Sequence, residues 1–186
     1  IAAAALLSVG FMYFPEQTQK AVDAIASFAS DAGKYVGKAI AYARLLGNSQ
    51  INCLAGIAPK NVASEKAEET LIANLRYAAA ELKKAGILLI AEPINTYDIP
   101  GFFLNRSAQA IAIFDRVGSD NLKLQYDIYH MQRMEGELAK TIERLMPRIA
   151  HIQIAGNPNR TEPDRGEINY AFLFELIERL GYGGWI

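Results

Sequence analysis

Three oxygen-bearing side chains stand at or near the ends of three apolar runs in the sequence. Glu92 follows LLIA and precedes a proline, Asp127 ends LKLQYD, and Gln153 lies near the end of IAHIQI. Such runs predict buried strands, and the carboxyl ends of parallel strands meet at one edge of a sheet. Hard divalent cations such as Mg²⁺ and Mn²⁺ prefer oxygen ligands. We therefore expect a metal site here, although each residue alone could simply cap a loop.

Two further side chains are candidates for contact with a substrate at this edge. His130 lies three residues after Asp127, where it could hydrogen-bond a substrate oxygen or move a proton. Arg160, in the polar stretch GNPNRTEP, could hold a substrate carboxylate through two parallel hydrogen bonds. The alternatives are a histidine bonded to a backbone carbonyl and a solvated arginine. We expect His151, the other histidine, to be packed rather than to bind a ligand.

A metal site of this kind can move a proton between neighbouring carbon atoms. The cation polarises a carbonyl and a neighbouring hydroxyl, and a carboxylate then carries the proton through an enediolate. Glu92 could be that base. A second acid would come from another strand.

The elements that must position these side chains alternate between strands and helices. Ser64 and Ser107 are expected to cap two of the helices, and 128–136 and 155–169 are expected to be loops. Periodicity predicts strands over 9–14, 50–55, 88–91, 122–127 and 149–154, a strand starting at 185–186, and helices over 21–29, 35–46, 65–84, 108–117, 137–146 and 170–180.

This order predicts an α/β fold with a parallel sheet, either doubly wound or closed into a barrel. A doubly wound nucleotide fold would carry a glycine-rich first turn, and neither GxGxxG nor GxxxxGK[ST] occurs. The loops after strands are longer than those after helices, as in a barrel. A (β/α)₈ TIM barrel needs about 250 residues, so we expect one that is incomplete at both ends of this chain.

Composition argues against several classes of protein. The 186 residues, 51% of them hydrophobic, suffice for one core, and we treat residues 1–186 as a single domain. The net charge of −1 implies no basic face for nucleic acid. The single cysteine, Cys53, excludes an internal disulfide and fits a buried thiol in the reducing cytoplasm. The apolar residues 1–14 are fewer than the roughly 20 that span a bilayer, so no membrane is expected.

Four segments carry a specific resemblance to a known family. AEPINTYDIPGFFLN, QYDIYHMQRMEG, RIAHIQIAGNP and EPDRGEINY…GYGGW closely resemble hydroxypyruvate isomerases, over roughly residues 34–186. This family belongs to the xylose-isomerase-like barrel group, with 2-oxo-tetronate isomerases and ketose 3-epimerases as cousins. The resemblance implies a (β/α)₈ barrel that interconverts hydroxypyruvate and tartronate semialdehyde (2-hydroxy-3-oxopropanoate) with a divalent metal ion, Mg²⁺ or Mn²⁺.

The resemblance also implies roles for the candidate residues. Glu92 matches the first catalytic glutamate and metal ligand, Asp127 the second ligand and Gln153 the third. His130 and Arg160 match positions that contact substrate in the epimerase cousins. A histidine usually stands at the position of Gln153 in those cousins, so the glutamine favours the hydroxypyruvate or oxo-tetronate branch.

The sequence departs from the family at its end. The family follows GW-I with a further glutamate, both fourth ligand and second catalytic acid, whereas this sequence ends at Ile186. We therefore expect the 186-residue chain to lack isomerase activity by itself. Three alternatives remain: a 2-oxo-tetronate isomerase, a ketose 3-epimerase, and a barrel remnant that binds a small ligand or a partner without turnover. Uncovered apolar edges could also drive association into a homo-oligomer. An endonuclease of the same barrel type is disfavoured by the charge balance and by the presence of two histidines.

Overall fold

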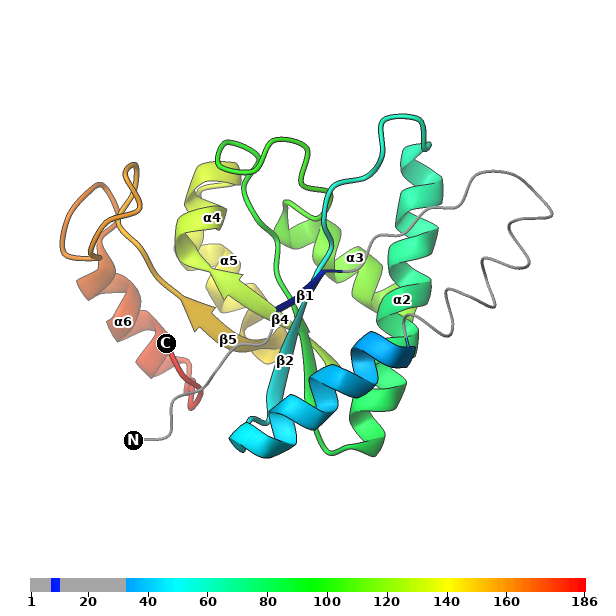
Figure 1. Cartoon of the computed structure of the whole chain (residues 1–186). Coiled ribbons are helices and arrows are strands. Elements are labelled where there is room, and N and C mark those ends of the chain that lie inside the picture. The colour runs from blue at the N-terminus through cyan, green and yellow to red at the C-terminus, as the bar shows by residue number, and fades with distance from the viewer. Residues whose placement is uncertain (1–7, 11–32) are drawn as a thin grey trace.

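Five parallel strands form one sheet in the computed structural model, which describes residues 8–10 and 33–186 (Figure 1). A doubly wound sheet reverses its strand order at a switch point, whereas a barrel keeps its strands in chain order. Here the order is β1-β2-β3-β4-β5, and every pair is parallel. The predicted barrel architecture is therefore confirmed for this part of the chain. The strands are β1 (Ser8–Gly10), β2 (Gln50–Leu54), β3 (Leu88–Ala91), β4 (Leu122–Asp127) and β5 (Ile149–Gln153).

Helices follow the strands and pack against the sheet in a single apolar core. The helices predicted over 35–46 and 65–84 are confirmed, and their apolar residues Val36, Ala39, Leu71 and Leu75 are buried in that core. Gly118 ends α3 in the left-handed conformation (φ 68°), which glycine adopts without strain. The helices are 33–46, α2 (Ser64–Lys84), α3 (Ser107–Val117), α4 (Ile128–Met134), α5 (Leu138–Leu145) and α6 (Tyr170–Arg179), with a 3₁₀ turn η1 at Met146–Arg148.

The alternation of side chains along β4 separates the core from the site. Leu122, Leu124 and Tyr126 are buried in the core shared with the helices. Successive residues of a strand point to opposite faces. Gln125 and Asp127 therefore point to the face of the sheet opposite the helices, which is the inside of the partial barrel. Asp127 does so at the carboxyl end of the strand.

Two predicted helix caps are wrong. The N-cap of α2 is Ala63 and that of α3 is Arg106, and neither side chain caps its helix, because each serine is the first helical residue. The backbone N–H of Ser107 instead donates to Glu135, which arrives from the end of α4. The Ser107 hydroxyl donates to the same carboxylate at 2.8 Å. The acceptor at the start of α3 thus comes from a distant segment, which local sequence cannot indicate.

The predicted loop over 128–136 is also wrong, because α4 occupies most of it. Asp127 has extended backbone angles and is the N-cap of α4. Its carboxylate accepts the backbone N–H of His130 at 3.1 Å, which satisfies a donor of the first turn. The helix then brings its first buried residues, Tyr129 and His130 among them, beside the strand ends.

Three expectations concern the two ends of the sequence. The strand expected over 9–14 is seen as β1 only at Ser8–Gly10, and the rest of it, like the helix expected over 21–29, lies outside the described residues. Residues 185–186 are not a strand, although the N–H of Ile152 donates to the Trp185 carbonyl at 3.3 Å. No helix in the described parts of the chain has the length and apolar character needed to cross a membrane.

Candidate metal and substrate site

Glu92 lies one residue beyond β3 and is only 5% exposed. Its Oε2 accepts two hydrogen bonds, from Asn52 Nδ2 on β2 at 2.8 Å and from Gln125 Nε2 on β4 at 2.6 Å. Burial, and next the nearby charge of Asp127, raise the pKa of Glu92 to about 8. Without a cation the carboxyl group is therefore mostly protonated at neutral pH. The proton belongs on Oε1, because both amides donate to Oε2.

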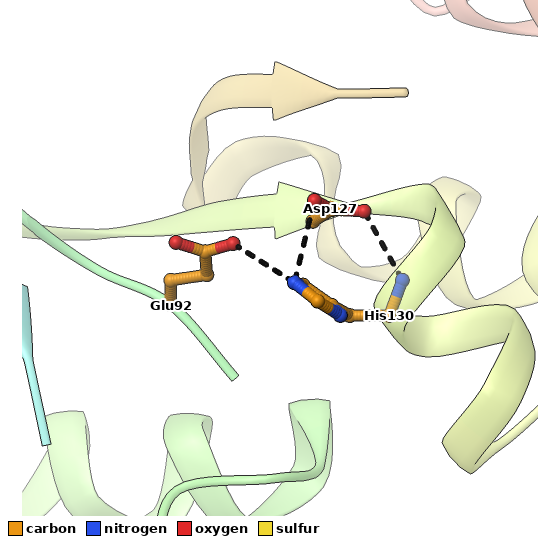
Figure 2. Close-up of side chains that lie close together, drawn as sticks. All are labelled: Glu92, Asp127 and His130. Carbon is orange, nitrogen blue, oxygen red and sulfur yellow. Dashed lines mark hydrogen bonds and ion pairs between the residues drawn. The ribbon is translucent and has the colours of Figure 1, made fainter. Parts of the chain in front are cut away.

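Asp127 supplies the second carboxylate from the end of β4 and is 4% exposed. While its Oδ1 caps α4, its Oδ2 lies 3.7 Å from His130 Nε2. Figure 2 shows that the Glu92 and Asp127 carboxylates approach the same ring nitrogen, and Glu92 Oε1 is 3.8 Å from it. Ligand atoms of Glu92, Asp127 and His130 all lie within 4.8 Å of one another.

His130 is buried in the first turn of α4, and burial lowers its pKa. Its Nδ1 lies 2.6 Å from the Nδ2 of Asn95, a fully buried side chain after β3. The structure thus places His130 beside the carboxyl ends of the strands, as predicted; we call this edge of the sheet the mouth of the site. The other histidine, His151, is buried on β5 and lines a cavity with Asp127 and Gln153, and its packed role stays a prediction.

Gln153, at the end of β5, is joined to Glu92 through a residue that sequence reasoning missed. The Nε2 of Gln125 donates to Gln153 Oε1 at 2.7 Å as well as to Glu92 Oε2. Gln125 therefore links the ends of three adjacent strands. The available signal was its place two residues before Asp127, which puts it on the same strand face one layer deeper.

The donor set fits a divalent cation. Two buried carboxylates converge, which is unfavourable unless a proton or a cation compensates the charge. Asn52 Oδ1 and Gln125 Oε1 are buried beside Glu92 and have no hydrogen-bond partner within the described residues. Oxygen-rich surroundings of this kind suit Mg²⁺ or Mn²⁺ better than a soft metal.

Arg160 reaches the site from the long loop after β5. Its guanidinium lies 5.4 Å from the centroid of the Tyr129 ring, within cation–π range. It lines a cavity of about 150 Å³ with Glu92, His130 and Gln153, and a neighbouring cavity of about 390 Å³ with Asp127 and Gln153. The structure therefore brings all five predicted site residues to one mouth.

A second arginine joins three segments around that mouth. Arg133 on α4 donates to the Tyr129 hydroxyl at 3.0 Å and to the carbonyl of Pro158 at 3.0 Å. Its guanidinium also stacks 4.9 Å from the ring centroid of Tyr97 and lies 3.8 Å from the Asp98 carboxylate. The loop after β3, helix α4 and the loop after β5 are thereby held together.

Glu167 and Cys53 lie away from the converging carboxylates. The Glu167 carboxylate accepts hydrogen bonds from Gln132 and Asn157, and the N-cap of α6 is Asn169. Cys53 is buried as predicted, and desolvation raises the pKa of its thiol to about 12, which makes it unreactive.

The described part of the chain is a parallel (β/α)-barrel arc with Glu92, Asp127 and Gln153 at or next to successive strand ends. The sequence profile described as xylose isomerase-like TIM barrel matches residues 23–186, and the chain belongs to this family.

Two curated relatives are similar to this chain in sequence. Hydroxypyruvate isomerase of Escherichia coli (strain K12) is 56% identical over 151 residues, which cover 81% of this chain and 58% of the relative. 2-Oxo-tetronate isomerase of Cupriavidus necator is 46% identical with the same coverage. The chain thus spans 58% of the length of these two curated relatives.

Solved structures agree on the fold. A protein described as AP endonuclease, family 2, from Brucella melitensis has a TM-score of 0.82 at 35% identity, covering 96% of this chain and 69% of that one. An L-ribulose 3-epimerase has a TM-score of 0.75 at 21% identity, covering 99% and 70% respectively, a likeness that shows the fold alone.

Proposed function

We propose that the protein is a metal-dependent isomerase that interconverts hydroxypyruvate and tartronate semialdehyde. The observation that carries the proposal is the convergence of Glu92, Asp127 and His130 within 4.8 Å at neighbouring strand ends. The identities of 56% and 46% to isomerases named for a hydroxy-keto acid and an oxo-tetronate support the substrate class. We further assign the enzyme to carbohydrate metabolism in the cytoplasm, as a single domain over residues 1–186.

Glu92, Asp127 and Gln153 are the residues that would hold Mg²⁺ or Mn²⁺. When bound, the cation polarises the substrate carbonyl and the adjacent hydroxyl oxygen, which acidifies the carbon that carries the hydroxyl. Gln125 supports this role, because its amide fixes Glu92 Oε2 and Gln153 Oε1 in place.

The reaction needs one proton to leave C3 of hydroxypyruvate and one to arrive at C2, while a hydroxyl proton passes from O3 to O2. Glu92 Oε1 is the oxygen to which neither Asn52 nor Gln125 donates, and it is our candidate for the proton at carbon. His130 Nε2 would donate a hydrogen bond to a substrate oxygen. Arg160 would bind the substrate carboxylate, whose charge matches its guanidinium.

The runner-up substrate is a 2-oxo-tetronate, favoured by the relative that is 46% identical. Ketose epimerisation has weaker support, because the L-ribulose 3-epimerase structure is only 21% identical and shares the fold alone. An endonuclease is disfavoured by the net charge of −1, since nucleic-acid binding depends on a basic face.

A chimaera tests the proposal directly. The 151 matched residues of this chain replace their counterparts in E. coli hydroxypyruvate isomerase. We expect the chimaera to isomerise hydroxypyruvate with Mn²⁺ or Mg²⁺, and Glu92→Gln to lower kcat at least about 100-fold. Glu69→Gln, at an exposed position on α2, serves as the matched control and should leave kcat unchanged.

The substrates are compared in the same protein. Hydroxypyruvate, 2-oxo-tetronate and a ketopentose are each followed by proton exchange in D₂O. A folded, Mn²⁺-binding chimaera that prefers the oxo-tetronate or the ketopentose would overturn the substrate assignment. One that binds Mn²⁺ and turns over none of them would favour the binding-only alternative.

A further inference from the structure

Asn95 has an unambiguous orientation in the loop after β3. Its Oδ1 accepts the backbone N–H of Tyr97 at 3.0 Å and that of Asp98 at 2.8 Å. Only a carbonyl oxygen can accept two donors, so the amide cannot be turned over. Its Nδ2 therefore faces Asp98 Oδ2 at 3.0 Å and His130 Nδ1 at 2.6 Å.

This orientation dictates where the neutral imidazole of His130 carries its proton. The Asn95 amide nitrogen has only hydrogens to offer, so His130 Nδ1 must be the acceptor. A neutral histidine has one acceptor and one donor nitrogen. The proton consequently resides on Nε2, the nitrogen that lies 3.8 Å from Glu92 Oε1 and 3.7 Å from Asp127 Oδ2.

A protonated Nε2 can donate a hydrogen bond, but it has no lone pair for a cation. Histidines that bind metals donate their other ring N–H to an acceptor, which fixes the ligating tautomer. At His130 that position is occupied by a donor. We infer that Asn95 is a positioning residue that keeps His130 as a hydrogen-bond donor toward substrate and excludes it from the ligand set formed by Glu92 and Asp127.

The substrate part of this inference rests on the proposed function, whereas the tautomer does not. Asn95→Asp tests it with almost no change of shape. The carboxylate still accepts the two backbone N–H groups, but it presents an acceptor to His130 Nδ1. We expect the proton to move to Nδ1 and the lone pair of Nε2 to turn toward Glu92 and Asp127.

The readout is a long-range ¹H–¹⁵N correlation spectrum of the metal-free 186-residue chain at pH 8. The sequence contains two histidines, so a His151→Asn variant assigns both rings. The wild-type chain should show a protonated Nε2 on His130, and Asn95→Asp a protonated Nδ1. A merely structural asparagine predicts the same tautomer in both proteins.

A second variant guards against misfolding. The new carboxylate would face Asp98, and Asn95→Asp/Asp98→Asn removes that repulsion while keeping the acceptor. A protonated Nδ1 in the wild-type chain, or an unchanged tautomer in either folded variant, would overturn the inference.

Metal affinity gives an independent check, with Zn²⁺ and Mn²⁺ as the probes. Gaining an imidazole ligand should raise the affinity for Zn²⁺ relative to Mn²⁺ by about 10-fold or more in Asn95→Asp. Adding His130→Gln should abolish that gain, which separates it from the effect of the added charge. A gain that survives the loss of His130 would refute the role of the ring. Neither the tautomer spectrum nor the metal affinities depend on turnover. These results would therefore test the role of Asn95 even if the protein is not an isomerase.

Discussion

Replacing Glu92 by glutamine should stabilise the metal-free protein at alkaline pH. Glutamine keeps the shape of the protonated carboxyl group, and its oxygen can accept from Asn52 and Gln125 as Glu92 Oε2 does. The pKa of Glu92 is raised from 4.5 to about 8 by burial and by Asp127. The folded protein therefore retains a proton that the unfolded chain releases above pH 4.5. The stability that this proton provides is full below that pH and is lost as the pH rises through 8.

The size of the effect follows from the two pKa values of Glu92. Each pKa unit is worth about 1.4 kcal/mol, so the free energy of unfolding should fall by roughly 3 to 4 kcal/mol between pH 5 and 8. Glu92→Gln lacks this dependence. His130, whose pKa burial lowers, makes an opposite contribution at acidic pH in both proteins. The difference between the two proteins therefore reports Glu92 together with its coupling to His130, whose Nε2 lies 3.8 Å from Glu92 Oε1.

The assay is urea unfolding of both proteins in a chelator at pH 5, 6, 7 and 8. Glu69→Gln, on the exposed face of α2, is the control and should differ from the wild type by no more than about 0.5 kcal/mol at any pH. A constant difference between Glu92→Gln and the wild type across this range would refute the buried, proton-bearing carboxyl. So would a wild type that gains stability relative to the variant as the pH rises.

Three further outcomes are expected. Saturating Mn²⁺, at about 100 times its Kd, should raise the free energy of unfolding at pH 8 by about 2.7 kcal/mol; thermal unfolding with and without the ion measures this, and Asp127→Asn should remove the gain. Gln125→Leu should weaken Mn²⁺ binding about 10- to 100-fold by calorimetry, because both of its acceptors lose their shared donor; an unchanged Kd would contradict that role. Gly166→Ala should destabilise the protein by about 1 to 3 kcal/mol or more in urea, because its Cβ would lie 2.1 Å from the Asn157 carbonyl oxygen at φ +108°. Gly183→Ala, with open space around it, is its control and should change little.

Repeating patterns made much of the fold predictable. Apolar runs located strands β2 to β5, and the helical stripe through Leu71 and Leu75 located α2. A polar side chain directly after such a run lies at the edge of the sheet where the strands end. That is why the sequence alone predicts that Glu92 and Asp127 lie close together.

The features that could not be predicted depend on partners far away in the sequence. Helix α4 looked like a loop because its seven residues are too few for a periodic signal and its cap, Asp127, belongs to the preceding strand. Glu135 satisfies the first turn of α3 from 28 residues away. Asn52 lies inside the strand predicted over 50–55 and Asn95 after the strand predicted over 88–91, and only the folded chain shows that their amides face Glu92 and His130.

The contacts of Arg133 have a consequence for motion at the mouth of the site. Arg133 lies on α4, and its guanidinium contacts Tyr97 in the loop after β3 and the Pro158 carbonyl in the loop after β5. Helix α4 therefore cannot move outward without losing its contacts with both loops, whereas either loop loses only its own contact with Arg133. Ligands would then enter and leave past one loop at a time while α4 stays in place.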